Sequence, residues 1–111
     1  MVPITEKLIE EMTNVIVREV NPQKVIAFGS FTRGSLGRDS DVDLLVIEDM
    51  PFSRNRSRFH EINRIRRMLV QFRVPKDILV YSKAEEDKWK SSKNHILAHC
   101  LRDGKVLYER R

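Results

Sequence analysis

Three aspartates lie where predicted strands begin. Asp41 and Asp43 flank Val42 at the start of an apolar run, and Asp77 opens a later one. Side chains alternate between the two faces of a strand, so the carboxylates of Asp41 and Asp43 share a face. Because these like charges repel each other, we expect a divalent cation there, and oxygen ligands suit Mg²⁺ or Mn²⁺. With Asp77, the trio would hold two metal ions around an in-line phosphoryl displacement, and Asp77 would also take a proton from the attacking hydroxyl.

A glycine and a serine precede the acidic pair. Gly29-Ser30 closes the apolar run Val25–Phe28, and residues 31–40 separate it from Asp41. Glycine lets a phosphate approach the backbone, and a helix starting after Ser30 would direct N–H groups at it. Alone, each feature has an ordinary reading as a turn, a cap or a surface acid. Together, and between two buried strands, they predict a phosphate cradle and a metal site joined by one loop.

The elements that must position these residues alternate between helices and strands. Thr5 is a candidate N-cap, Asn21-Pro22 and Pro75 are helix stops, and Ser82 with Glu85 matches a capping box. Hydrophobic spacing then predicts a helix to about residue 20, followed by strands over 25–28 and 41–47. A helix over about 53–72 comes next, and its apolar face is Phe59, Ile62, Ile65, Leu69 and Phe72. A strand over 77–81, a helix from 82 to about 101 and a short edge strand over 106–108 complete the order. This order predicts an α/β fold around one small sheet.

The positive charge of the chain is concentrated in one segment. Net charge is +5, and eight of the 21 basic residues lie between positions 54 and 76, against the single acid Glu61. Such a segment could face nucleic acid, an acidic partner or the phosphates of a bound nucleotide, or it could be a solvated helix face. Charge alone does not decide among these.

Length and composition bound the remaining possibilities. The 111 residues suit one domain, residues 1–111, and no apolar run approaches the roughly 20 residues of a membrane helix. We expect a cytoplasmic protein, because nothing resembles a secretory signal and Cys100 is the only cysteine. His95 and His99 would share a helix face beside Cys100, but a zinc site is disfavoured since no acidic general base accompanies them.

Gly29-Ser30, the following ten residues and Asp41-Val42-Asp43 resemble the signature of the DNA polymerase beta nucleotidyltransferase superfamily. Within it the chain is similar to the stand-alone minimal nucleotidyltransferases, and the ending Gly104 to Tyr108 also matches them. The resemblance implies a small mixed sheet with flanking helices. It further implies that Asp41 and Asp43 bind both metals, that Asp77 completes the second site, that Gly29 and Ser30 hold the triphosphate, and that Arg33 contacts phosphate.

Many minimal members of this superfamily are antitoxins of HEPN-type toxins. Some of these antitoxins attach AMP to a tyrosine of the toxin. The resemblance therefore implies ATP as the nucleotide donor and a HEPN-type protein as the partner, with a homo-oligomer also compatible. Two alternatives belong to another class: a non-catalytic module that neutralises its partner by contact, and a nucleic-acid binder that uses the arginine-rich helix. All three carboxylates and Gly29-Ser30 favour the enzyme, because a pure binding module has no need of them.

Overall fold

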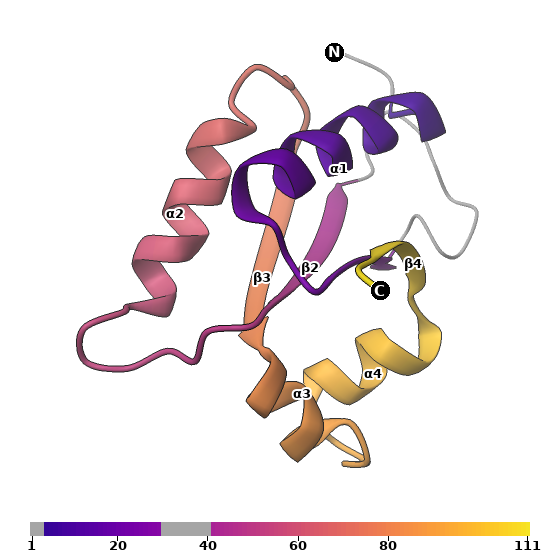
Figure 1. The fold of residues 1–111 in the computed structure, drawn as a ribbon. Coiled ribbons are helices and arrows are strands. Elements are labelled where there is room, and N and C mark those ends of the chain that lie inside the picture. Colours follow the sequence, from indigo (N-terminus) through magenta and orange to yellow (C-terminus); the bar gives the residue numbers. More distant parts are fainter. Residues whose placement is uncertain (1–3, 30–40) are drawn as a thin grey trace.

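A computed structural model describes residues 4–29 and 41–111 of the chain. Its elements run α1 (Glu6–Val20), β1 (Lys24–Phe28), β2 (Val42–Glu48), α2 (Arg58–Met68), β3 (Lys76–Ser82), α3 (Lys83–Trp89), α4 (Ile96–Asp103) and β4 (Lys105–Glu109). The strands form one sheet in the order β3-β2-β1-β4, in which β1 is antiparallel to both of its neighbours and β2 is parallel to β3. The expected α/β fold with a small mixed sheet and flanking helices is confirmed (Figure 1).

Helices cover both faces of the sheet, and β2 is buried between them. Val42, Leu44 and Val46 of β2 pack in one core cluster with side chains of α1 and α2, whereas Leu45 and Ile47 pack in a second cluster with Leu97 and Cys100 of α4. Side chains from the two faces of β2 therefore pack in two separate hydrophobic layers, as expected for a strand with a continuous apolar run. β3 and β4 form the two edges.

Local signals set several element boundaries as expected. The Thr5 side chain accepts a hydrogen bond from the Leu8 N–H, and Asn21 ends α1 in the left-handed conformation with φ of 52°. Ser82 and Glu85 form a complete capping box at the start of α3. The short C-terminal strand exists and pairs with β1. The structure confirms these caps, which could be predicted because a cap depends only on neighbouring residues.

The long middle helix was predicted too long at both ends. Ser53 and Arg56 exchange two backbone hydrogen bonds in a tight turn, and Ser57 then caps α2, which begins at Arg58. The prediction that Phe59 belongs to the apolar face is also wrong, since its side chain is 69% exposed. Phe59 precedes Ile65 by six residues, which turns it about 120° away from the buried face.

The last helix was predicted as one element and is two. α3 ends at Trp89, and α4 begins at Ile96 after a break. The ring of His95 stacks on Trp89 at 4.6 Å between centroids, and its Nδ1 accepts a hydrogen bond from the Leu97 N–H as the N-cap of α4. The break lets α4 pack against both α3 and β1, and Figure 1 shows α4 next to α3.

Candidate active site

The backbone of Gly29 lies directly against the carboxylate of Asp43. β1 and β2 are antiparallel, and Phe28 pairs with Asp43 in their register, so the end of β1 meets the start of β2. Gly29 has φ of +73°, and a Cβ atom built on it would lie 2.2 Å from Oδ2 of Asp43. A side chain is excluded there by both the left-handed backbone and the contact. Any larger residue would displace the carboxylate.

Asp43 and Asp77 occupy matching positions on neighbouring parallel strands. They are register partners in the β2–β3 ladder, and the Val42 N–H donates to the Pro75 carbonyl at 2.9 Å just before them. Asp43 keeps the parity of Leu45 and Ile47, and Asp77 keeps that of Leu79 and Tyr81, so both carboxylates belong to the face covered by α3 and α4. The fold thus brings together two acids that are distant in sequence.

The remaining predicted site residues are placed less completely. Asp41 precedes β2 and is exposed, and Asp77 is exposed as well. Ser30 and Arg33 lie outside the described residues. Within residues 4–29 and 41–111, no three His, Cys, Asp or Glu side chains form a group arranged to hold a metal ion. The three-aspartate metal site therefore stays a prediction, for which the structure supplies the Asp43–Asp77 pair.

Cys100 of α4 lies below the acidic end of the sheet, where it is buried at 3% exposure. Burial, together with the negative charges of Asp43 and Asp103, raises the pKa of its thiol to about 11. A thiol that stays protonated near neutral pH is a poor nucleophile, so Cys100 serves as a small packing residue. His99 is exposed and contacts Arg102.

The arginine-rich segment lies on the other side of the sheet from Asp43 and Asp77. α2 packs on the face that holds Val42 and Leu44, which is opposite to the acidic face. Three of the arginines are used internally: Arg56 pairs with Glu48, Arg58 with Glu85, and Arg64 with Glu61. The placement argues against a role for α2 in holding the phosphates of a nucleotide at the acidic end.

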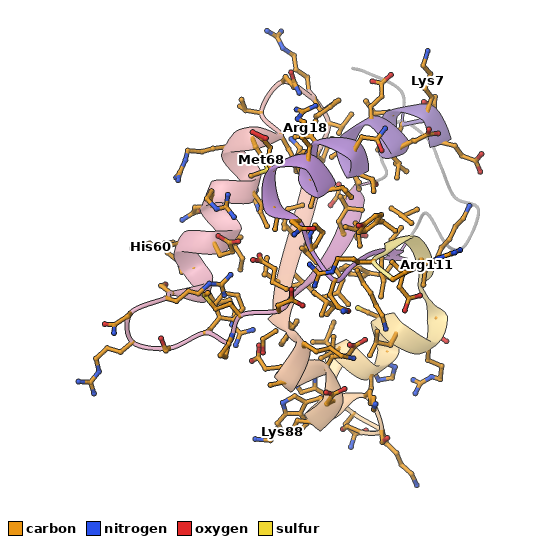
Figure 2. The ribbon with its side chains drawn as sticks, in the orientation of Figure 1. Lys7, Arg18, His60, Met68, Lys88 and Arg111 are labelled. Atoms are coloured by element: carbon orange, nitrogen blue, oxygen red, sulfur yellow. The ribbon has the colours of Figure 1, made fainter. Side chains whose placement is uncertain are left out.

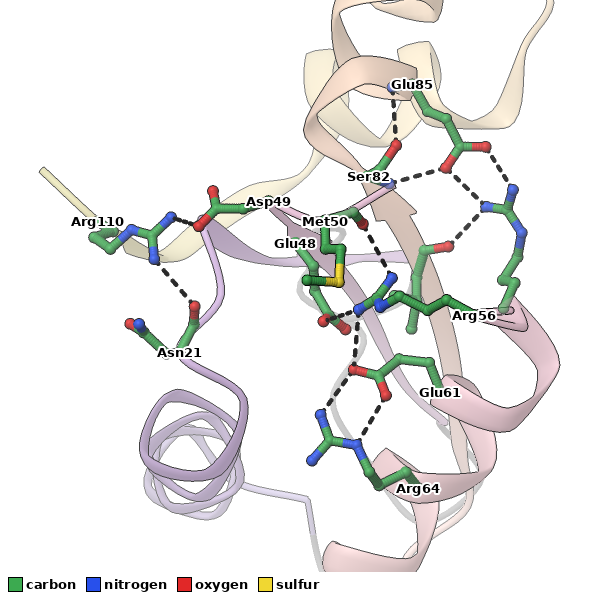
Figure 3. Close-up of polar contacts among 12 residues, drawn as sticks. Asn21, Glu48, Asp49, Met50, Arg56, Glu61, Arg64, Ser82, Glu85 and Arg110 are labelled. Carbon is green, nitrogen blue, oxygen red and sulfur yellow. Dashed lines mark hydrogen bonds and ion pairs between the residues drawn. The ribbon is translucent and has the colours of Figure 1, made fainter. Parts of the chain in front are cut away.

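Sequence reasoning missed a buried acidic pair at the far end of β2, drawn in Figure 3. Glu48 is 6% exposed and Glu61 is 8% exposed, and Nη2 of Arg56 lies 2.6 Å from Glu48 and 3.6 Å from Glu61. Arg64 makes two hydrogen bonds of 2.8 Å to Glu61. The only signal in the sequence was a lone glutamate within a basic segment, which does not reveal its partner.

The pKa values of Glu48 and Glu61 are shifted in opposite directions. Burial, followed by a hydrogen bond with Glu61, raises the pKa of Glu48 to about 8. The hydrogen bonds from Arg64 hold the pKa of Glu61 down to about 2. Among the described residues, Oε2 of Glu48 is a buried atom that lacks a hydrogen-bond partner, and a proton on Glu48 would let it donate to Glu61. The network ties α2 and its preceding loop to β2.

Comparisons with known proteins bear on this arrangement. The family model of the nucleotidyltransferase domain matches residues 9–102. The chain is also similar to a protein of Methanocaldococcus jannaschii named "Putative protein adenylyltransferase MJ0604", at 29% identity over 108 residues that cover 93% of this chain and 97% of that protein.

Solved structures share the fold. A structure described as a putative nucleotidyltransferase from Sulfolobus solfataricus has a TM-score of 0.63 at 22% identity, over 94% of this chain and 79% of that one. A toxin–antitoxin solved with AMP-PNP has a TM-score of 0.56 at 19% identity, over 92% and 74% of the two chains. A mutant of the MntA-HpeT toxin–antitoxin has a TM-score of 0.57 at 15% identity, over 97% and 76%.

Proposed function

The chain belongs to the nucleotidyltransferase domain family, and from that premise we propose that it transfers AMP from ATP to a side-chain hydroxyl of a partner protein. The expectation of a nucleotidyltransferase is confirmed by the family match. The donor, the acceptor and the metal are the proposal. No helix in the described part of the chain has the length and apolar character needed to cross a membrane.

One observation carries the proposal: Gly29 directly after β1, Asp43 on β2 and Asp77 on β3 meet at one end of the sheet. The absence of a side chain at Gly29 leaves room for the Asp43 carboxylate, and a glycine backbone also permits the close approach of a phosphate. Two carboxylates side by side form a hard, anionic oxygen donor set of the kind that Mg²⁺ or Mn²⁺ prefers. The residues present therefore fit a divalent metal, held by Asp43 and Asp77 with Asp41 beside them.

Each residue has a defined task in the proposed reaction. The acceptor oxygen attacks the α-phosphorus, a new P–O bond forms, the bond between the α-phosphorus and its bridging oxygen to the β-phosphate breaks, and pyrophosphate leaves. Asp77, which is exposed beside Asp43, takes the proton of the attacking hydroxyl. Gly29 leaves room for the Asp43 carboxylate, and its backbone, together with Ser30 and Arg33, is proposed to bind the triphosphate. When bound, the divalent metal neutralises developing negative charge on the phosphoryl oxygens.

The proposed acceptor rests on the relatives. One similar protein is named an adenylyltransferase of proteins, and two structural neighbours are toxin–antitoxin assemblies, one of them solved with AMP-PNP. These names support ATP as the donor and a protein as the acceptor, and we propose a HEPN-type toxin as that protein. The chain would then act as an antitoxin by modifying it.

Transfer and binding can be tested separately. Calorimetry should show ATP binding in Mg²⁺ that weakens strongly in EDTA, because a divalent metal held by Asp43 and Asp77 would offset the charge of the triphosphate. Equal affinity in both buffers would contradict a metal-bridged site. The chain is then co-expressed with the product of the neighbouring gene, and mass spectrometry should reveal AMP on that product.

Matched aspartate variants decide whether the chain acts as an enzyme on this partner. The adduct should disappear with Asp77→Asn and persist with Asp87→Asn, a control at an exposed aspartate of α3. A partner that is left unmodified, yet is inhibited equally by wild type and Asp77→Asn, would instead show neutralisation by contact.

A further inference from the structure

A small basic cavity opens on the outer side of α2, beside the start of β3. Its volume is about 370 Å³, and it is lined by Asn63, Arg66, Arg67, Val70 and Lys76. Arg66 and Arg67 are exposed, and within the described chain neither makes an ion pair. Among the described residues, no acidic side chain lines the cavity. Three cations therefore surround one hollow without a counter-ion in its wall.

These cations also disfavour one another. Lys76 donates from Nζ to the Phe72 carbonyl at 2.9 Å, which holds its ammonium group in the cavity wall. Arg66 and Arg67 line the same cavity and carry the same positive charge. Packing positive charges together without compensation is unfavourable, and an anion placed among them would relieve the repulsion.

A neighbouring cavity on the same helix shows the contrasting arrangement. It is lined by Asn55, Arg56, Ser57, His60, Glu61, Arg64 and Arg67, and His60 points outward from α2 in Figure 2. There Arg56 and Arg64 already pair with Glu61. The basic segment is thus divided into an end whose charge is used to hold the fold and an end whose charge faces outward.

We propose that the cavity between α2 and β3 binds an acidic segment of the acceptor protein, rich in Asp and Glu and carrying one apolar side chain. This inference rests on the proposed function, because it concerns how the acceptor is held. The acidic charges would meet Arg66, Arg67 and Lys76, and the apolar side chain would cover Val70. Charge complementarity of this kind speeds association and fixes orientation.

Two features favour a protein segment over nucleic acid. Val70 is 74% exposed in the cavity wall, and a phosphodiester backbone offers it no apolar partner. The described lining residues include no aromatic side chain, so they offer no stacking platform of the kind that single-strand binders use. The position suits an acceptor as well: β3 is an edge strand, and Lys76 directly precedes Asp77 on it. A partner held on Lys76 can therefore reach around this edge to the acidic face.

Peptide binding tests the proposal without nucleotide or metal. The probe is the peptide Glu-Asp-Leu-Glu-Asp, titrated to millimolar concentration against the ¹⁵N-labelled full chain. Amide shifts should change at Asn63, Arg66, Arg67 and Val70, and the affinity should fall as salt increases. Replacing the peptide leucine by serine should weaken binding, because Val70 loses its partner. A single-stranded RNA of equal charge should bind more weakly.

Variants with equal loss of charge provide the control. Arg66→Gln/Arg67→Gln should weaken peptide binding about tenfold, since two surface charge contacts are lost. Arg54→Gln/Lys93→Gln removes two exposed charges elsewhere and should leave binding unchanged. Both double variants alter exposed side chains without ion pairs in the described chain, so folding should persist.

Each alternative outcome overturns the proposal. No shift changes at millimolar peptide, unchanged affinity in Arg66→Gln/Arg67→Gln, or equal weakening in the control would show that the cavity is no acidic-segment site. Tighter binding of RNA that depends on Arg66 and Arg67 would assign the surface to nucleic acid. Metal-dependent ATP binding is measured on wild type and on both double variants. If wild type does not bind ATP in a metal-dependent way, the proposed function alone is refuted. If wild type binds ATP but not the peptide, only the docking surface is refuted.

Discussion

The carboxylates at the two ends of β2 have opposite surroundings. At the end of the strand, Glu48 is buried and pairs with Arg56, which also contacts Glu61. At its start, Asp43 faces another acid, Asp77, across the parallel ladder and the backbone of Gly29 across the antiparallel one. Within the described residues, Asp41 and Asp77 have no ion pair with Lys or Arg.

This contrast separates structural acids from candidate catalytic ones. A buried acid that the protein itself neutralises stabilises the fold, and its perturbed pKa is a by-product of burial. Acids gathered on neighbouring strands beside a glycine form an oxygen donor set that suits an external divalent cation. Perturbed pKa values are often used to find functional sites, and here the strongest ones mark the structural end instead.

The largest expected effect is on nucleotide transfer. Asp43→Asn and Asp77→Asn should each reduce transfer at least about a hundredfold, because each removes a carboxylate that is proposed to hold the metal, and Asp77→Asn also removes the proposed proton acceptor. Glu48→Gln should leave transfer near wild type. Transfer of labelled AMP at saturating ATP measures both. Asp77→Asn should not lower the melting temperature, and strong destabilisation of the metal-free protein would show that Asp77 is structural.

Removing the compensating cation at the other end should mainly affect stability. Arg56→Gln leaves Glu48 and Glu61 next to each other without their shared guanidinium, so we expect the free energy of unfolding to fall by about 2 kcal/mol. Urea denaturation at neutral pH measures this. Arg54→Gln, at an exposed neighbour without an ion pair in the described chain, is the control and should change stability little. Equal effects of the two changes would contradict the structural role of Arg56.

Gly29→Ala tests the contact at the start of β2. A Cβ at φ of +73° is strained and would strike the Asp43 carboxylate, so a loss of about 1–2 kcal/mol is expected together with impaired ATP binding. In the double variant Gly29→Ala/Asp43→Ala the contact is gone and only the backbone strain remains. Chemical denaturation should therefore show less than additive destabilisation. Additive losses would mean that Gly29 does not press on Asp43.

The smallest effect concerns pH. Glu48 has its pKa raised from 4.5 to about 8, so the folded state keeps a proton that the unfolded state loses, and stability falls as pH rises through this window. Glu61 has its pKa lowered from 4.5 to about 2, so its contribution is present above pH 4.5 and is lost as pH falls toward 2.

Melting curves should reveal the raised pKa of Glu48. The melting temperature of Glu48→Gln, relative to that of wild type, should rise between pH 4.5 and 8. Above pH 8 the difference between the two melting temperatures should stay constant. Glu10→Gln, at an exposed glutamate of α1, should show no such change. Parallel profiles of Glu48→Gln and wild type throughout this window would indicate an ordinary carboxyl group at Glu48.

Local features of this protein were readable from its residues. The cap at Thr5, the helix stop at Asn21-Pro22, the capping box at Ser82 and the apolar runs of the strands each depend on a few neighbouring positions. The grouping of Asp41 with Asp43 beyond Gly29-Ser30 was equally visible and indicated the chemistry and the family. These signals are local in origin, so the chain expresses them before any distant part has packed.

Only the tertiary structure decided which distant residues meet. The parallel register places Asp77 beside Asp43, and packing on opposite faces separates the carboxylates from the basic helix. It also revealed the burial of Glu61, the exposure of Phe59 and the break before α4. Strand register and the buried face of a helix follow from the packing of the whole core. The local sequence permits several registers and several helix faces, and only the packing of helices against the sheet selects among them.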